Sequence, residues 1–290
     1  MSSSARLLWS PSETAETQMA HFAATVAADY GFEWKNDYHQ LWQWSVDKPE
    51  EFWSALWEWH GIIGDKGTRM IENPGKMPGT KFFPDATLNY AENMLSFDDR
   101  LRDIPALIAH GEDGRRTVLS RADLRDKVLR LAGWMRARGV IKGDRVAGYV
   151  PNSEIALIAM LASASLGAIF SSCSPDFGIT GVTDRFGQIE PKILISINGY
   201  HYNGKIIDKR EVVAQLVDAL PSIEAVLIDF YLDDYRDISM IRAASVFADA
   251  LTHAPLDSFV RVGFNDPLFI LYSSGTTGAP KCIVHSVGGT

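Results

Sequence analysis

The segment DRVAGYVPNSEIALIAMLASASLGAIFSSCSP, residues 144–175, decides the expected fold. Residues 144–151 are a short apolar run that is typical of a buried strand, and residues 153–167 have the length and apolar character of a buried helix. Residues 168–175 return to a strand pattern. A strand, a helix and a second strand in this order form a βαβ unit with parallel strands. The segment therefore predicts a parallel sheet that is covered by helices.

The neighbouring sequence continues this alternation. Residues 120–139 open with the Ser120 and Asp123 pair of a capping box and close at Gly139, which predicts a helix. Further along, we expect a helix at 180–190, a strand at 191–197, a helix from 210 that stops before Pro221, and strands at 223–230 and 266–274. The predicted fold class is α/β, with mostly parallel sheets covered by helices, over residues 96–290.

The N-terminal third has a different composition. Seven of the eight tryptophans lie before residue 60, so we expect residues 1–95 to form a separate, Trp-rich helical unit. Within it, residues 46–61 predict a helix with Pro49 at its first position and Gly61 after its end. Aromatic residues at helical spacing are interpreted as core packing rather than cofactor contacts. Residues 61–85 are rich in Gly, Pro and Lys and are expected to form a linking loop.

Composition excludes several functional classes. The formal net charge is −8 and no basic stripe offsets it, which argues against nucleic-acid binding. No apolar segment is long enough to span a membrane, and the N-terminus lacks a signal-peptide pattern. Cys173 and Cys282 share neither metal-ligand spacing nor a CxxC pattern, so we expect no metal site there and a reducing, cytoplasmic location.

The C-terminal segment LYSSGTTGAPKCIVHSVGGT, residues 271–290, carries the main candidate site. Small residues allow consecutive backbone N–H groups to converge on an anion, the hydroxyls add donors, and glycine tolerates positive φ. Lys281 adds a full positive charge. The pattern fits neither the Walker loop nor the Rossmann fingerprint, and a surface turn is the alternative interpretation. We predict that the following residues bind phosphate: Ser273, Ser274, Gly275, Thr276, Thr277, Gly278 and Lys281.

Residues 272–285, YSSGTTGAPKCIVH, closely resemble the phosphate loop of the adenylate-forming superfamily, which includes acyl-CoA synthetases, luciferases and peptide-synthetase adenylation domains. Residues 82–95, FFPDATLNYAENML, are similar to an N-terminal segment of short-chain acyl-CoA synthetases. Residues 149–178, RFGQIEPKIL at 185–194 and YNGK at 202–205 look specifically like the acetoacetyl-CoA synthetases. The acetyl-CoA branch instead has Phe-Gly-Gly-Phe where this chain has CSPDFG. The resemblance covers about residue 35 to the end.

The resemblance implies a ligase that uses ATP, Mg²⁺ and coenzyme A. Acetoacetate and ATP would give an acyl adenylate and pyrophosphate, and coenzyme A would then take the acyl group and release AMP. By the same resemblance, Ser174, Pro175 and Asp176 would lie near the adenine of coenzyme A, and Lys205 would contact its phosphate. Tyr202 departs from the pattern, because related acetyl enzymes carry arginine there. A solvated loop lysine is the alternative for Lys205.

The resemblance also implies that much of the catalytic machinery lies beyond the equivalent of Thr290. The acyl pocket, the Mg²⁺-associated glutamate, the ribose-binding aspartate, an arginine and the adenylation lysine all belong there. We therefore expect an N-terminal fragment that is inactive alone and whose partner is the remaining half of the same protein. Two alternatives stay open: an acetyl-, propionyl- or butyryl-CoA synthetase, and a non-catalytic nucleotide- or CoA-binding module.

Overall fold

The computed structural model describes residues 6, 8, 9, 17–273, 278 and 280–290. The chain divides into two compact units. The first unit comprises residues 1–62 and 66–83, and the second unit comprises residues 63–65 and 84–290. The expected domain ranges of 1–95 and 96–290 stay a prediction.

Three helices form the body of the first unit: α1 (Gln18–Tyr30), α2 (Tyr38–Asp47) and α3 (Pro49–Trp59). The Thr17 side chain caps α1 by accepting a hydrogen bond from the Ala20 N–H, and the side chain of Asp37 caps α2 in the same way. Pro49 begins α3, and Gly61 follows its end with a φ of +58°, as expected. The predicted linking loop also contains a short hairpin, β2 (Ile71–Glu72) and β3 (Lys81–Phe82).

Aromatic side chains build the core of the first unit. Trp44 is buried, stacks on Phe32 at a centroid distance of 4.8 Å and meets Phe52 edge-on at 5.8 Å. The interpretation of the aromatic residues at 46–61 as core packing is confirmed for Trp57, whereas Trp53 and Trp59 keep large exposed surfaces.

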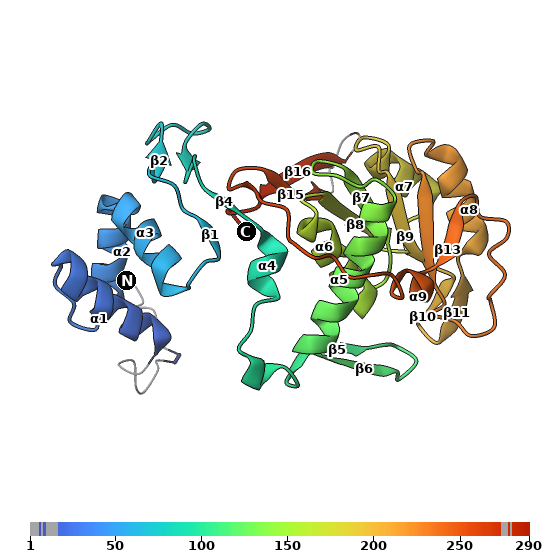
Figure 1. Ribbon diagram of the computed structural model, residues 1–290, viewed down its shortest axis with the longest axis horizontal. Helices are drawn as coiled ribbons and strands as arrows, with labels where there is room; N and C mark the ends of the chain where they lie inside the picture. Colours follow the sequence, from blue (N-terminus) through green and yellow to red (C-terminus); the bar gives the residue numbers. More distant parts are fainter. Residues whose placement is uncertain (1–5, 7, 10–16, 274–277, 279) are drawn as a thin grey trace. The chain divides into compact units, whose positions relative to one another are not determined.

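A seven-stranded sheet is the centre of the second unit (Figure 1). Its order is β13 (Ala244–Val246), β12 (Ala225–Asp229), β9 (Ile193–Ile197), β7 (Arg145–Tyr149), β8 (Ile169–Cys173), β15 (Pro267–Ser273) and β16 (Lys281–Ser286). Neighbouring strands from β13 to β15 are parallel, whereas β16 pairs with β15 in the antiparallel sense. The predicted α/β class is confirmed, and residues 144–175 form the expected unit of β7, α6 (Glu154–Ser165) and β8.

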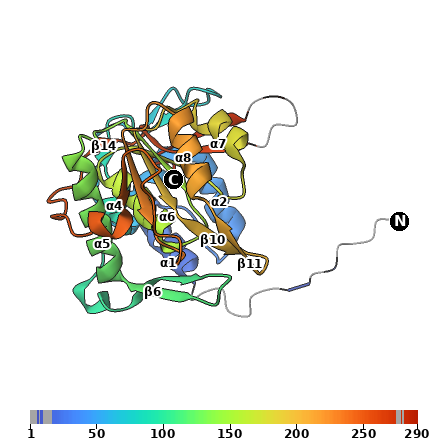
Figure 2. The ribbon, with the colours of Figure 1, turned by 90° about the vertical axis from the view of Figure 1, so that its right-hand side faces the viewer.

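Helices cover both faces of this sheet. Helices α7 (Ile179–Phe186) and α8 (Arg210–Ala219) pack on one face, where their apolar side chains join alternate residues of the strands in a buried cluster. Helices α5 (Arg121–Ala137) and α6 lie on the other face, with α9 (Phe247–Ala250) beside α5. Figure 2 shows α5 and α8 on opposite sides of the sheet. The predicted caps of α5 are confirmed: Ser120 and Asp123 form both bonds of a capping box, and Gly139 has a φ of +73°.

Two hairpins and a small sheet surround this core. The hairpins are β5 (Pro105–His110) with β6 (Arg116–Ser120), and β10 (Gly199–Tyr202) with β11 (Lys205–Asp208). The small sheet joins β1 (Gly64–Asp65), β4 (Thr87–Leu88) and β14 (Val262–Gly263), next to α4 (Tyr90–Met94) and a 3₁₀ turn at Asp99–Leu101. Asn89 fixes this region, because its buried Nδ2 donates to the backbone oxygens of Ala164 and Val260 at 2.8 Å each. In the described part of the chain, no helix has the length and apolar character needed to cross a membrane.

Candidate functional site

The predicted site segments meet at one edge of the central sheet. The parallel strands β7, β8, β9, β12 and β15 all end at this carboxyl edge, where ligands bind in open α/β sheets. Residues 174–176 follow β8 and residues 274–280 follow β15, and these two strands are neighbours in the sheet. The structure therefore brings the ends of both segments to the same edge, although Ser174 and Ser273 are 99 positions apart in sequence.

The predicted phosphate loop connects β15 to the antiparallel strand β16. Ser273 and Lys281 are paired residues at its two ends; Ser273 is half-buried and Lys281 is exposed. Gly278 has a φ of +92°, as the loop chemistry requires. Ser274, Gly275, Thr276 and Thr277 lie outside the described residues.

Helix α7 and the turn after it contact both predicted segments. Gln188 Nε2 donates to the Pro280 backbone oxygen at 2.9 Å, next to the start of β16. The Arg185 guanidinium lies 4.3 Å from the ring centre of Phe177 and 5.7 Å from that of Tyr272. Neither residue is among the predicted site residues, because RFGQIE predicts part of a helix and carries the family resemblance, and no local pattern in it indicates that a positive charge would lie between the two segments.

Tyr272 and Cys173, at the buried end of the site, are both uncharged at neutral pH. Burial raises the pKa of Tyr272 to about 12 and that of the Cys173 thiol to about 11. The Tyr272 hydroxyl lies 3.0 Å from Ser171 Oγ. Cys173 is buried, whereas Cys282 is partly exposed and its Sγ lies 3.6 Å from Gln188 Oε1. Both cysteines are free.

The turn formed by Ser174, Pro175 and Asp176 is held by side chains on both sides. Ser174 Oγ donates to Asp176 Oδ2 at 2.8 Å, and the Tyr200 hydroxyl donates to Asp176 Oδ1 at 2.5 Å. The Tyr149 hydroxyl lies 2.8 Å from the Pro175 backbone oxygen and 2.7 Å from that of Phe177. Neither tyrosine was a predicted site residue.

These contacts set the protonation states of the turn. Hydrogen bonds from Tyr200 and Ser174 hold the pKa of Asp176 below its usual value, so this group is a carboxylate at neutral pH. Burial, followed by the hydrogen bond to Asp176, raises the pKa of Tyr200, and burial raises that of Tyr149 to about 12. Lys209 Nζ lies 5.6 Å from the ring centre of Tyr200 and 5.8 Å from that of Tyr149, and desolvation lowers its pKa.

Lys205 lies on the hairpin that also carries Tyr200. It begins β11, is exposed and pairs with Tyr202 across the hairpin. Asn203 and Gly204 form the turn with φ values of +49° and +72°, the left-handed pair of a type I′ turn. The hairpin thus links Lys205 to the Asp176 turn through Tyr200, while Lys205 itself projects from the tip region.

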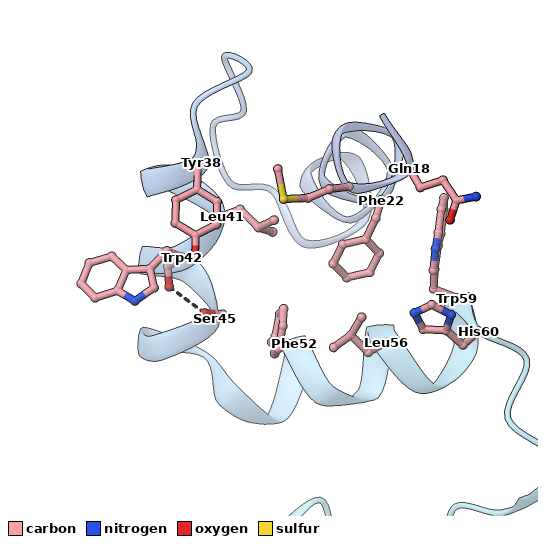
Figure 3. A pocket seen from close by; sticks show the side chains of 11 residues that line it. Gln18, Phe22, Tyr38, Leu41, Trp42, Ser45, Phe52, Leu56, Trp59 and His60 are labelled. Carbon is pink, nitrogen blue, oxygen red and sulfur yellow. Dashed lines mark hydrogen bonds between the residues drawn. The ribbon is translucent and has the colours of Figure 1, made fainter. Parts of the chain in front are cut away.

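A separate cavity of about 340 Å³ lies among the three helices of the first unit. Figure 3 shows part of its lining, in which Phe22 from α1 and Phe52 and Leu56 from α3 point toward the open space. None of the predicted site residues lines it. Across the described residues, no group of three or more His, Cys, Asp or Glu side chains could hold a metal ion.

Comparison with known proteins supports the resemblance seen in the sequence. Residues 97–290 match the AMP-binding enzyme family, and residues 38–94 match the family described as acetyl-coenzyme A synthetase N-terminus. The acetoacetyl-CoA synthetases of Macaca fascicularis and Rhizobium meliloti are each 41% identical over 98% of this chain and 44% of their own length.

The fold comparison agrees. The acetoacetyl-CoA synthetase from Streptomyces lividans superposes with a TM-score of 0.89 and 38% identity, covering 95% of this chain and 42% of that protein. The chain spans less than half the length of the relatives it matches. Because one family accounts for two thirds of the residues and the neighbouring family for most of the remainder, this chain belongs to the AMP-binding enzyme family.

Proposed function

We propose that the protein is an acetoacetate–CoA ligase. In this proposal ATP and acetoacetate react to give acetoacetyl adenylate and pyrophosphate, and coenzyme A then takes the acyl group while AMP leaves. The supporting observation is the common position of the two predicted segments after the neighbouring strands β8 and β15, in a chain that is 41% identical to acetoacetyl-CoA synthetases.

The phosphate loop would contribute charge stabilisation and positioning. Attack of the carboxylate on the α-phosphorus develops negative charge on the departing pyrophosphate, and preorganised donors at that position lower the barrier. Residues 273–278 would supply backbone N–H groups and hydroxyls, and Lys281 a positive charge, around the β- and γ-phosphates. The exposed Lys281 and half-buried Ser273 at the two ends of the loop fit these roles.

Mg²⁺ would neutralise part of the triphosphate charge when it is bound. Mg²⁺ in such sites is usually held by substrate phosphates and one or two carboxylates, and the resemblance assigns its glutamate to the part beyond the equivalent of Thr290. We further propose that coenzyme A approaches the carboxyl edge at Ser174, Pro175 and Asp176, with Lys205 as the contact for its phosphate. Free cysteines at 173 and 282 suit a cytoplasmic protein.

The 290-residue chain alone would not complete the reaction in this proposal. It corresponds to 44% of the length of its relatives, and the family resemblance assigns the acyl pocket and the catalytic lysine to the part that those relatives have beyond it. The partner required for activity would be that remaining part of an acetoacetyl-CoA synthetase.

The acid substrate is the part of the proposal that most needs a test. A malonamoyl-CoA synthetase of Penicillium aethiopicum is 38% identical over 98% of this chain, so similarity at this level spans at least two acids. We would express the complete reading frame and measure pyrophosphate release with acetoacetate, malonamate, acetate, propionate and butyrate. Acetoacetate should give the highest kcat/KM. A higher kcat/KM with another acid would mean that this acid, and not acetoacetate, is the substrate. Nucleotide binding without pyrophosphate release with any of the five acids would favour a non-catalytic binding module.

A further inference from the structure

Tyr200 is placed to control the shape of the Asp176 turn. It lies on β10, where it pairs with Ile207 of β11, and only 5% of its surface is exposed. Its hydroxyl reaches Asp176 Oδ1 at 2.5 Å, so a side chain from the hairpin fixes a carboxylate on the turn after β8. A hydrogen bond from a buried donor to a charged acceptor is among the stronger kinds in proteins.

Tyr149 holds the backbone of the same turn from the adjacent strand. Its hydroxyl lies within 2.8 Å of the Pro175 and Phe177 backbone oxygens, and its side chain is fully buried. The Ser196 hydroxyl donates to the Tyr149 backbone oxygen at 2.9 Å, which joins β9 to the same network. The turn is therefore held by two hydroxyl groups: that of Tyr149 contacts its backbone oxygens, and that of Tyr200 contacts the carboxylate of Asp176.

The half-buried ammonium of Lys209 lies between these two rings, 5.6 Å from the centre of Tyr200 and 5.8 Å from that of Tyr149. The charge on Asp176 favours the charged form of Lys209. Asp176 itself is exposed, and its oxygens receive one hydrogen bond each from Ser174 and Tyr200. A carboxylate oxygen accepts two hydrogen bonds, so acceptor capacity on Asp176 remains for a ligand.

We propose that Tyr200 is a positioning residue for coenzyme A, which acts by holding Asp176 and the turn at residues 174–177 in the shape that receives the nucleotide end of that substrate. The inference rests on the proposed function for the identity of the ligand. The free acceptor capacity of Asp176 suits amino and hydroxyl donors of the adenosine moiety, whereas its charge repels phosphates. The turn thus faces the base and ribose of coenzyme A rather than its phosphates.

The test compares Tyr200→Phe with Tyr235→Phe in the protein from the complete reading frame. Both changes remove one hydroxyl and keep the ring, and Tyr235 lies in the loop after β12, where its ring faces Arg210. Tyr200→Phe should raise KM for coenzyme A roughly 10- to 150-fold, the range expected for one hydrogen bond to a charged group. Acetoacetate-dependent exchange between ATP and pyrophosphate should stay at the wild-type rate, as should both reactions in Tyr235→Phe.

Pantetheine separates positioning from general damage, because it carries the thiol without the nucleotide. Its rate as acyl acceptor should be equal in wild type and Tyr200→Phe. An unchanged KM for coenzyme A, or a parallel fall in exchange and pantetheine rates, overturns the inference. The double variant Tyr200→Phe/Asp176→Ala should have the same KM for coenzyme A as Asp176→Ala alone. If its KM instead rises by the product of the two single effects, Tyr200 does not act through Asp176.

A direct binding measurement keeps this inference separate from the proposed function. If the wild-type protein shows no acetoacetate-dependent exchange, the proposed function fails. Calorimetric titration of coenzyme A then still tests Tyr200. The inference stands if wild type binds and Tyr200→Phe binds roughly 10- to 150-fold more weakly, and it falls if wild type does not bind or the two affinities are equal.

Discussion

Ser273 and Lys281 are paired across the antiparallel strands β15 and β16, so both ends of the connecting loop are fixed at one point of the carboxyl edge. Such pairs bring the two backbones to within about 5.5 Å of each other. The Ser273 hydroxyl and the Lys281 ammonium therefore start from neighbouring positions. This arrangement differs from a Walker loop, in which the lysine lies at the start of a helix rather than on a strand.

Replacement of Lys281 by alanine should slow adenylate formation. Lys281 is exposed on an edge strand, and no carboxylate within the described ranges pairs with its ammonium, so its removal leaves the fold intact. Loss of one charge that stabilises a leaving group typically lowers a rate by about 10²- to 10³-fold. Acetoacetate-dependent pyrophosphate release in the complete protein measures the effect.

Lys76→Ala is a suitable control for this variant, because Lys76 is an exposed lysine in the segment between β2 and β3. It should release pyrophosphate at the wild-type rate. Wild-type turnover in Lys281→Ala, with its melting temperature also unchanged, would remove Lys281 from the mechanism.

Gly278→Ala tests whether the backbone of the loop, and not only its charge, matters for ATP. Gly278 has a φ of +92°, and a Cβ there would meet no atom of the described residues within 4 Å, so the change adds backbone strain. Gly114 in the β5–β6 turn has a φ of +80° and the same open surroundings, which makes Gly114→Ala a control matched for strain. Both variants should lose about 1 kcal/mol of stability. Only Gly278→Ala should also raise KM for ATP, and equal KM values would contradict the phosphate role.

The sequence was most informative where local and long-range requirements agree. Residues 144–175 predict β7, α6 and β8 correctly because a fully buried parallel strand must be apolar on both faces. The α5 boundaries follow from Ser120, Asp123 and Gly139, whose chemistry satisfies the backbone groups at the helix ends. In both places the local pattern and the tertiary packing favour the same helix or strand.

The part of the site that depends on tertiary contacts could not be predicted in this way. Tyr149 and Tyr200 lie 51 positions apart, and no periodicity relates either of them to the Asp176 turn. The hairpin that delivers Tyr200 did have a local signal, because Asn203–Gly204 is the preferred pair of a type I′ turn. That dipeptide was considered only as part of the YNGK resemblance, and so β10 and β11 were missed.

Gly133→Ala should destabilise the second unit although it improves helix propensity. In an exposed helix this change stabilises by about 1 kcal/mol. Here a Cβ at Gly133 would lie 2.0 Å from the Ala254 backbone oxygen, where the loop after α9 crosses α5. The Leu256 N–H donates to the Leu129 backbone oxygen at 2.8 Å, which holds that loop against the helix. Overpacking of this kind costs about 3 kcal/mol.

Gly181→Ala on α7 provides the contrast for Gly133→Ala. Its Cβ would come no closer than 3.3 Å, and its nearest neighbours are side-chain atoms of Phe177 and Arg185. Urea unfolding should show a lower midpoint for Gly133→Ala and little change for Gly181→Ala. Equal midpoints would mean that the loop at residue 254 moves away without loss of stability.

Asp229→Asn should stabilise the protein at neutral pH. Asp229 ends β12, and burial, reinforced by the charge of Glu154, raises its pKa to about 6. The unfolded value is about 3.9, so between these two pH values the native state holds more protons than the unfolded state. Stability therefore falls as pH rises from about 4 to 6 and stays at the lower level above that range. Asparagine removes the buried charge and should recover up to roughly 3 kcal/mol at pH 7.

Asp208→Asn should show the opposite sign, which makes the pair diagnostic. The hydrogen bond from Arg210 lowers the pKa of Asp208, so this carboxylate contributes stability that is present above its unfolded pKa and is lost as pH falls. Thermal melts at pH 4 and pH 7 measure both variants. Asp229→Asn should raise the melting temperature at pH 7 and leave it nearly unchanged at pH 4, whereas Asp208→Asn should lower it at pH 7. A lower melting temperature for Asp229→Asn at pH 7 would mean that the Asp229 carboxylate is stabilised by its surroundings, with Arg115 and Lys127 outweighing the effect of burial.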